Sequence, residues 1–261
     1  RDCGMTFDPS RSSKFSEPRS DFLMGVGYGH MNGYRRVTAL GNNPDVDTTG
    51  AEDVWTGGGA YPWMTAATAL EVVAGANDTA AGTGARTIRI DGLTAAWVEV
   101  SQTITLNGAT PVSIPTSLYR INGALIMSAG TGKVNAADIT IRDAGAGTTR
   151  CVIPAGYGIT RQSIYTVPAG HTLQIISQLF CVNRQAGVGR FATFATFIQT
   201  SAGIYRMPLE LSIGDEPPYR HDGAPGLILP EKTDFCHRCT AVSADITDIT
   251  AAWLGVLKDN T

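Results

Sequence analysis

Charged side chains are scarce in this chain. Lys, Arg, Asp and Glu make up 16% of its 261 residues, whereas about a quarter is usual for a soluble domain. The formal net charge is −3, so there is no basic excess with which to bind nucleic acid, and we expect no nucleic-acid partner. A surface with so few charges suits contact with other protein rather than with water.

Long hydrophobic runs are also missing. No apolar stretch approaches the roughly 20 residues that a membrane-spanning helix needs, and we therefore expect no membrane partner. The opening residues 1–5 (RDCGM) do not lead from a basic segment into an apolar one. We do not expect them to be a signal peptide.

Helical periodicity is absent too, whereas 30 residues are Gly. Short segments with strand-like alternation recur at intervals of about ten residues with turn residues between them, as in sandwiches and jelly rolls. We predict an all-β fold, with a jelly-roll-like β-sandwich domain over residues 64–261. Residues 1–40 show no sustained period, and the glycines between residues 25 and 33 oppose a stable helix. We predict that residues 1–63 form an extended, irregular N-terminal arm and junction.

Turn residues predict how some strands are connected. The Asn107-Gly108 dipeptide predicts a hairpin between residues 97–106 and residues 112–114. Asp91-Gly92 predicts a turn at the end of an earlier strand over residues 87–90.

Two further strand assignments can be tested directly. Residues 139–142 are expected to pair with residues 150–153 across the Gly-rich turn between them. Pro208 interrupts an otherwise strand-like segment, residues 205–213, and therefore predicts a sheet edge, since Pro has no N–H to donate.

The segment 43–63 joins the two parts of the sequence. It has Pro near each end and three consecutive Gly in the middle, so it cannot be a helix. Its aromatic side chains Trp55, Tyr61 and Trp63 need an apolar surface on which to pack. We predict that these three residues anchor the arm on the sandwich and so support assembly.

Five cysteines leave at least one unpaired within a single chain. We expect Cys3, in the arm, to be the candidate for an intermolecular disulfide. Two alternatives stay open for the others: they are buried free thiols, or some of them pair in an oxidising compartment. The possible disulfide residues are Cys3, Cys151, Cys181, Cys236 and Cys239.

The sequence offers no convincing metal or cofactor site. Cys236-His237-Arg238-Cys239 resembles half of a zinc knuckle, but no second close pair follows. In a regular strand the two sulfurs would also point in opposite directions. The acidic side chains between residues 45 and 53 do not have the spacing of a calcium loop. The glycines at residues 82–84 precede a strand, whereas a phosphate site needs a helix there.

Catalytic motifs are missing as well. The four histidines show no arrangement with Ser and Asp that the sequence can link, and no Gly-x-Ser-x-Gly motif exists. We therefore expect no catalytic residue, no cofactor and no enzymatic activity. A hydrolase acting on surface polysaccharide is the least favoured of the functions that we considered.

Several segments resemble virion structural proteins of tailed bacteriophages, over roughly residues 30–261. The N-terminal half of the resemblance lies in residues 43–47 (NPDVD), 52–55 (EDVW), 57–61 (GGGAY), 77–87 (NDTAAGTGART), 90–93 (IDGL) and 103–108 (TITLNG). The C-terminal half lies in residues 230–234 (PEKTD) and 253–257 (WLGVL).

The resemblance implies a non-enzymatic component of a virion. It would be an exterior head-decoration or fibre protein, a neck or collar protein, or a tail accessory protein. It would assemble as a symmetric oligomer, with a trimer favoured by analogy, and dock through its N-terminal arm on major capsid or neck proteins. The alternative is a tail-associated protein that binds a receptor or carbohydrate through exposed aromatics such as Trp97 and Tyr219.

Overall fold

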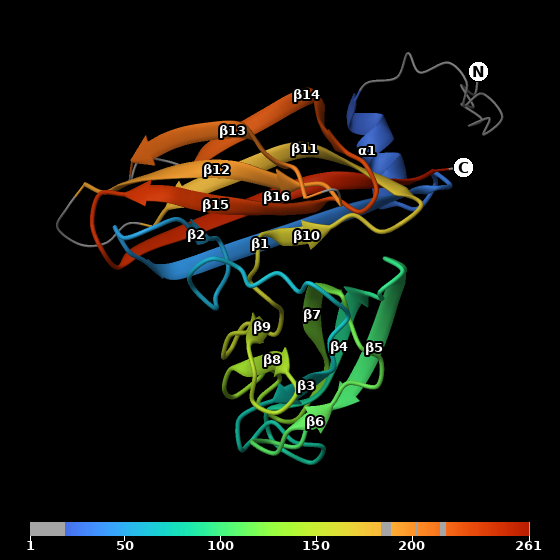
Figure 1. Ribbon diagram of the computed structural model, residues 1–261. Helices are drawn as coiled ribbons and strands as arrows, with labels where there is room; N and C mark the ends of the chain where they lie inside the picture. The colour runs from blue at the N-terminus through green and yellow to red at the C-terminus, as the bar shows by residue number, and fades with distance from the viewer. Residues whose placement is uncertain (1–18, 184–188, 202, 215–217, 261) are drawn as a thin grey trace, which may run out of the picture.

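The chain is almost entirely β-structure. The computed structural model describes residues 19–183, 189–201, 203–214 and 218–260. In these ranges there are sixteen strands and one helix, and every strand pairing is antiparallel (Figure 1). The predicted all-β class is confirmed. No helix in the described ranges is long and apolar enough to cross a membrane.

Two large sheets lie face to face in the upper half of Figure 1, and we call them the larger sheet pair. The first has the order β1 (Tyr34–Val46), β16 (Thr247–Asp259), β11 (His171–Val182), β14 (Tyr219–Leu229). The second has the order β10 (Ile164–Thr166), β15 (Asp234–Val242), β12 (Phe191–Gln199), β13 (Tyr205–Gly214), and β2 (Glu52–Asp53) also pairs with β15. Their inner faces share an apolar core, in which the rings of Phe180 and Phe194 are 5.2 Å apart.

Two smaller sheets lie below them in Figure 1, and we call them the smaller sheet pair. One has the order β6 (Val112–Ser113), β3 (Leu70–Val73), β8 (Ile139–Asp143), β9 (Thr149–Ile153). The other has the order β5 (Glu99–Thr105), β4 (Ala85–Leu93), β7 (Arg120–Ala129). They enclose a separate core of Ile, Leu and Val side chains.

The smaller sheet pair interrupts one strand position of the larger pair. β2 and β10 both pair with β15, at successive positions along it. Between them the His237 carbonyl accepts from the Val54 N–H, and the His237 N–H donates to the Ser163 carbonyl. Residues 54 and 163 are therefore neighbours along one edge of β15, and the whole smaller sheet pair is inserted between them.

The expectation of an irregular arm is wrong for residues 19–46. Residues 34–46 form β1, which pairs with β16 along its length. Arg19–Gly27 form helix α1 despite their glycines, because Phe22, Leu23 and Val26 pack on apolar residues of β11 and β16. Here tertiary packing outweighs the weak helix propensity of the segment.

The division of the chain after residue 63 stays a prediction. Strand pairing connects the two sides of that boundary, because β1 and β2 share sheets with strands from the C-terminal third of the chain. Residues 1–18 lie outside the described residues.

The turn-based predictions had mixed outcomes. The pairing of residues 139–142 with 150–153 is confirmed as β8 with β9, and β13, which contains Pro208, lies at a sheet edge as expected. The hairpin at Asn107-Gly108 is wrong, because β5 pairs with β4 whereas β6 pairs with β3. The turn at Asp91-Gly92 is also wrong: both residues lie inside β4, held between β5 and β7.

Candidate functional site

The predicted aromatic anchor lies where the two sheet pairs meet. Trp55 and Tyr61 are buried, and Trp63 is partly buried against them. The ring of Tyr61 makes edge-to-face contacts with both tryptophans, at centroid distances of 5.1 Å and 4.8 Å, a favourable geometry for aromatic pairs. They pack on Ile164 and Cys236 of β10 and β15. The three residues do come together, and their role in assembly stays a prediction.

The local chain is shaped to hold Trp55 in place. Its indole N–H donates to the Gly59 carbonyl at 3.1 Å. A Cβ on Gly57 would lie 2.2 Å from the indole ring, so only glycine fits there. The glycine run therefore closes a tight loop around the indole.

A buried ion pair lies beside the aromatic cluster. Arg120 of β7 donates two hydrogen bonds of 2.8 Å to Asp234 of β15, and both side chains are less than a tenth exposed. Burial opposes the charge of Arg120, but the hydrogen bonds and charge of Asp234 outweigh it and raise the pKa of the guanidinium. The Thr166 hydroxyl also donates to Asp234. This pair links the smaller sheet pair directly to the larger one.

Trp97 is only partly exposed and is packed against neighbouring side chains. Its ring packs against Tyr119 at a centroid distance of 4.9 Å, and the Arg120 guanidinium lies 5.2 Å from its centroid. Tyr219, the other aromatic of that hypothesis, is exposed on β14. The structure does not bring the two residues into one site.

The described cysteines are all free thiols: Cys151, Cys181, Cys236 and Cys239. The alternative of a disulfide among these four is therefore not found, and Cys3 lies outside the described residues. Burial raises the pKa of each thiol, to about 11 for Cys239, so the reactive thiolate is disfavoured.

The Cys-x-x-Cys segment does not form a metal site. Cys236 faces the aromatic cluster, whereas Cys239 faces the core between the large sheets, as the strand alternation predicted. Among the described residues no group of three or more His, Cys, Asp or Glu side chains is placed to hold a metal ion.

His237, between these cysteines, is a core residue. Its Nδ1 lies 2.8 Å from the Ser163 hydroxyl, and its Nε2 lies 2.7 Å from the Gln178 amide oxygen, which can only accept. Nε2 therefore carries the proton, and Nδ1 accepts from Ser163. Burial lowers the pKa of His237 to about 3. The imidazole is neutral, enclosed and structural.

The acidic residues of the junction are used as structural hydrogen-bond acceptors. Asp53 is fully buried and accepts two hydrogen bonds from Arg238. Glu52 accepts from the Asn43 amide and the Gly59 N–H. Asp45 and Asp47 are exposed. The acids thus serve different partners and do not converge on one ligand.

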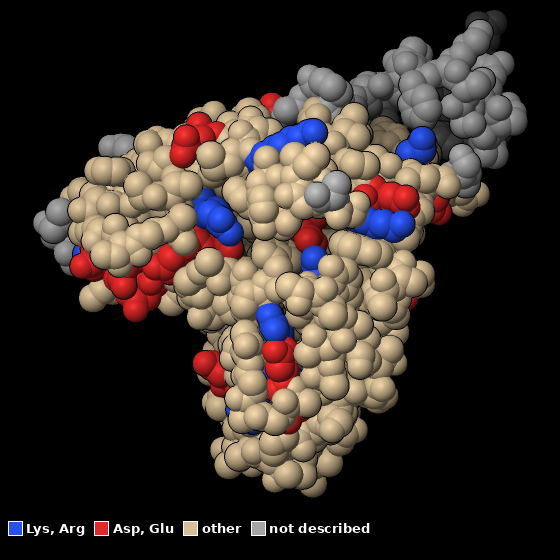
Figure 2. All heavy atoms as spheres, in the orientation of Figure 1, with Lys and Arg blue, Asp and Glu red and all other residues tan. Residues whose placement is uncertain are grey.

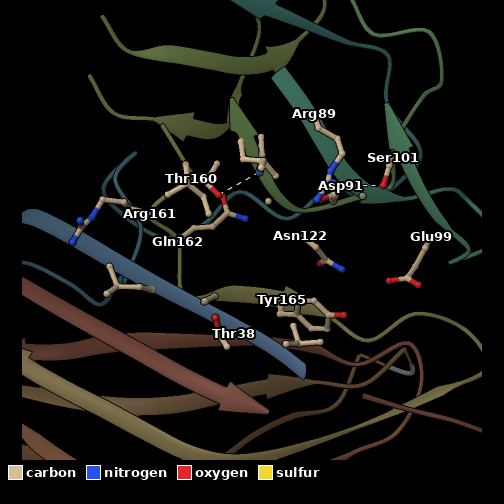
Figure 3. Close-up of a pocket in the computed structure, with 18 of the residues that line it drawn as sticks. Thr38, Arg89, Asp91, Glu99, Ser101, Asn122, Thr160, Arg161, Gln162 and Tyr165 are labelled. Atoms are coloured by element: carbon tan, nitrogen blue, oxygen red, sulfur yellow. Dashed lines mark hydrogen bonds and ion pairs between the residues drawn. The ribbon is translucent and has the colours of Figure 1, made fainter. Parts of the chain in front are cut away.

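An open cleft of about 780 Å³ lies on the other side of the junction, between β1 and the smaller sheet pair (Figure 3). One wall is residues 35–40 of β1. Opposite it lie side chains of β4, β5 and β7, and residues 159–162 together with Tyr165 complete the lining. Its volume is typical of ligand sites.

The charge of the cleft differs from that of the whole chain. Four arginines and two acids line it: Arg35, Arg36, Arg89, Arg161, Asp91 and Glu99. The net charge of the lining is therefore positive, although the chain carries −3.

The arginines of the cleft differ in how far they are paired. Arg35 pairs with Glu99 across the cleft, and Arg89 pairs with Asp91, which also accepts from Ser101 (Figure 3). Arg36 makes no ion pair or side-chain hydrogen bond with any described residue. The Arg161 guanidinium lies 4.5 Å from the Tyr157 ring centroid, and its buried Nε has no hydrogen-bond partner within the described ranges. Arg36 and Arg161 are thus the two arginines of the cleft without an acidic partner among the described residues.

Sequence reasoning missed this cleft. Its lining comes from separate segments spread between residues 35 and 165, and no local motif marks any of them. Arg120 was missed for the same reason, since its partner Asp234 is 114 residues away.

Comparison with known proteins gives no close relative. No protein-family model matches the chain, and no curated protein matches it. The resemblance to tailed-phage virion proteins therefore stays a prediction.

Weak structural matches exist to two structures of infectious bursal disease virus. One, the structure of the Gx strain, is 12% identical, with a TM-score of 0.26, over 87% of this chain and 72% of that one. The other, the crystal structure of the T13 viral particle, is 11% identical, with a TM-score of 0.27, over 87% of this chain and 69% of that one. TM-scores this low do not indicate a shared fold.

Proposed function

We propose that this chain is a non-enzymatic structural protein of a virus particle that assembles with copies of itself. The observation that carries the proposal is the strand order of the larger sheet pair. If β2 and β10 are counted as two halves of one interrupted strand, the pair has eight strands. Numbered along the chain, one sheet reads first, eighth, third, sixth, and the other second, seventh, fourth, fifth.

This order supports a jelly roll, in which the first and last strands are neighbours and the chain changes sheet at every connection except the one between the fourth and fifth strands. Jelly rolls with eight strands are used by viral capsid and lectin domains. Because a fold does not determine a function, a surface suited to assembly has to support the proposal as well.

Two features of the surface favour contact with other protein. Figure 2 shows that most of the visible face is neither acidic nor basic, in line with the low charged fraction. Large apolar side chains are also exposed on the two outer strands β13 and β14: Tyr205, Met207, Tyr219 and Ile228. Exposed apolar surface of this kind suits an interface between copies.

At a finer level, we propose a location on the exterior of a tailed-phage head or neck. This part rests on the residue resemblance in segments such as 43–47 and 57–61. It includes a symmetric oligomer, with a trimer favoured, which docks through the N-terminal segment on major capsid or neck proteins.

The proposal is tested by the oligomeric state of the full chain. We expect light scattering and electron microscopy to show one closed, symmetric assembly. Replacing Met207 and Tyr219 by Asp should dissociate it, whereas the matched replacement of exposed Thr38 and Tyr157 by Asp should not. A monomer at tens of micromolar protein would contradict self-assembly, because stable oligomers form well below that concentration.

A further inference from the structure

The cleft contains the unpaired edge of strand β1. β1 is the outermost strand of its sheet and pairs only with β16. At one end the Gly33 carbonyl accepts from Asp259, next to β16. Further along, the Asn42 N–H donates to the Arg161 carbonyl on the opposite edge, at 3.4 Å.

These two hydrogen bonds fix the direction of the backbone groups between them. Successive residues of a strand direct their N–H and C=O groups to alternate edges, and the register with β16 is regular from Tyr34 to Asn43. The backbone N–H and C=O groups of even-numbered residues, like those of Asn42, therefore point away from β16. The residues concerned are Arg36, Thr38 and Leu40, all of which line the cleft.

The backbone groups of these three residues have no backbone partner in the described parts of the chain. A row of free N–H and C=O groups is a template for another strand, and proteins usually cover it. Here the smaller sheet pair stands across the cleft and obstructs the approach of a whole sheet. It still leaves about 780 Å³, which is room for a single extended segment.

The side chains around this edge favour a particular kind of segment. Leu40, Leu125 and Ile159 give the lining an apolar part, with Leu40 and Ile159 exposed. Arg36 and Arg161, which have no acidic partner among the described residues, belong to the same lining, and Arg36 also borders the hollow beside α1. Arginine binds a carboxylate through two parallel hydrogen bonds. The lining therefore matches apolar side chains together with an acidic one.

We propose that the cleft binds an extended peptide segment bearing a carboxylate side chain, which adds to β1 as a further antiparallel or parallel strand. Main-chain hydrogen bonds to residues 36–40 would supply affinity, and the arginines would select the acidic side chain. The proposal rests on the geometry of β1 and does not require the virion role.

The test uses the full chain and a positional-scanning library of acetylated, amidated heptapeptides, with binding followed by fluorescence polarisation. We expect Asp or Glu to be selected at one position. N-methylation of alternate backbone amides in the best peptide should weaken binding roughly tenfold or more, since each methyl group removes a main-chain donor.

Two matched variants locate the binding on β1. Thr38→Pro removes an N–H that faces the cleft and leaves the β16 ladder intact, so it should weaken binding roughly tenfold, whereas Thr38→Ala should change it little. If Thr38→Pro lowers the folded population, Arg36→Glu replaces it. That variant should reject the acidic peptide and bind better when its carboxylate residue is replaced by Lys.

Three results would overturn the proposal. The first is that no library member binds more tightly than about 1 mM. The second is that N-methylated and unmodified peptides bind equally. The third is that free sugars bind the chain, and lose binding in Arg36→Glu, while every peptide fails, which would make the cleft a carbohydrate site.

Discussion

The junction between the two sheet pairs has a closed side and an open side. On the closed side, Trp55 and Tyr61 are buried and Arg120 is held by Asp234. On the open side, a cleft of about 780 Å³ separates β1 from the smaller sheet pair. The comparison indicates that the packed side fixes the angle between the sheet pairs and so keeps the other side from collapsing.

The same difference appears in the ion pairs. Asp234 accepts two hydrogen bonds from Arg120 and one from Thr166, all away from solvent. Arg35 and Glu99 pair across the open side, where both are more than a third exposed. Removing one partner of a buried pair is far more costly than removing one partner of an exposed pair. Substitutions on the two sides should therefore differ strongly in effect.

Trp55→Ala should have one of the largest effects. It removes a buried aromatic side chain that packs on Tyr61, and such truncations cost about 3–5 kcal/mol. Chemical denaturation should show this loss. Tyr157→Ala, at an exposed aromatic whose ring contacts the Arg161 guanidinium, is the control and should change stability by no more than about 1 kcal/mol. Equal losses for the two variants would mean that the indole is not part of the packed junction.

Arg120→Ala should be comparably destabilising. It leaves the Asp234 carboxylate buried without its cation, a change that costs about 3–5 kcal/mol. Arg89→Ala, which breaks an exposed pair, should cost at most about 1 kcal/mol. If Arg120→Ala matched Arg89→Ala in a urea titration, the buried pair would not be what holds the sheet pairs together.

His237 should make the larger sheet pair sensitive to acid. Burial lowers the pKa of His237 to about 3 in the folded chain. Below about pH 6.5, therefore, His237 is protonated in the unfolded chain but stays neutral in the folded chain until the pH approaches 3. The contribution of His237 to the free energy of unfolding is therefore fully present above pH 6.5. The free energy of unfolding then falls by up to about 1.4 kcal/mol per pH unit as the pH drops towards 3.

The measurement is the free energy of unfolding between pH 7 and pH 4, for the native chain and for His237→Gln. The variant should lose stability at pH 7 but show a shallower decline towards acid. Parallel curves would show that His237 is accessible to protons in the folded chain.

Arg35→Ala should have the smallest effect on stability. Its ion pair with Glu99 is exposed, and such pairs contribute about 0–1 kcal/mol. Denaturation midpoints should barely move. A loss of more than about 2 kcal/mol in the free energy of unfolding would indicate that the pair between Arg35 and Glu99 holds the two walls of the cleft together.

Local features of the fold were predictable from the sequence. The alternation around residues 139–142 and 150–153 identified two strands that do pair, and Pro208 marked an edge strand. Both signals act over short distances, through side-chain periodicity and through the missing N–H of Pro. Trp55, Tyr61 and Trp63 were identified as residues that need an apolar surface, and the structure packs them on one another and on β10 and β15, whereas their role in assembly stays a prediction.

Long-range features could not be predicted in the same way. β1 pairs with β16 about two hundred residues later, and nothing local in the segment 34–46 identifies that partner. Gly108 does adopt a positive φ of 61°, as a turn residue should. The strands on either side of it nevertheless pair with other strands. The turn was therefore predicted correctly, but the pairing of the two flanking strands was not. The cleft depends on such pairings and was invisible for that reason.

The most direct test of the account is amide hydrogen exchange along β1. The backbone amides of Val37 and Ala39 point towards β16 and should be protected from exchange. The backbone amides of Arg36, Thr38 and Leu40 point into the cleft and have no backbone partner in the described parts of the chain. In the isolated full chain we predict that these three amides exchange on the order of a hundredfold faster than their two neighbours. Equal protection of all five amides would contradict the free edge, and with it the open side of the junction.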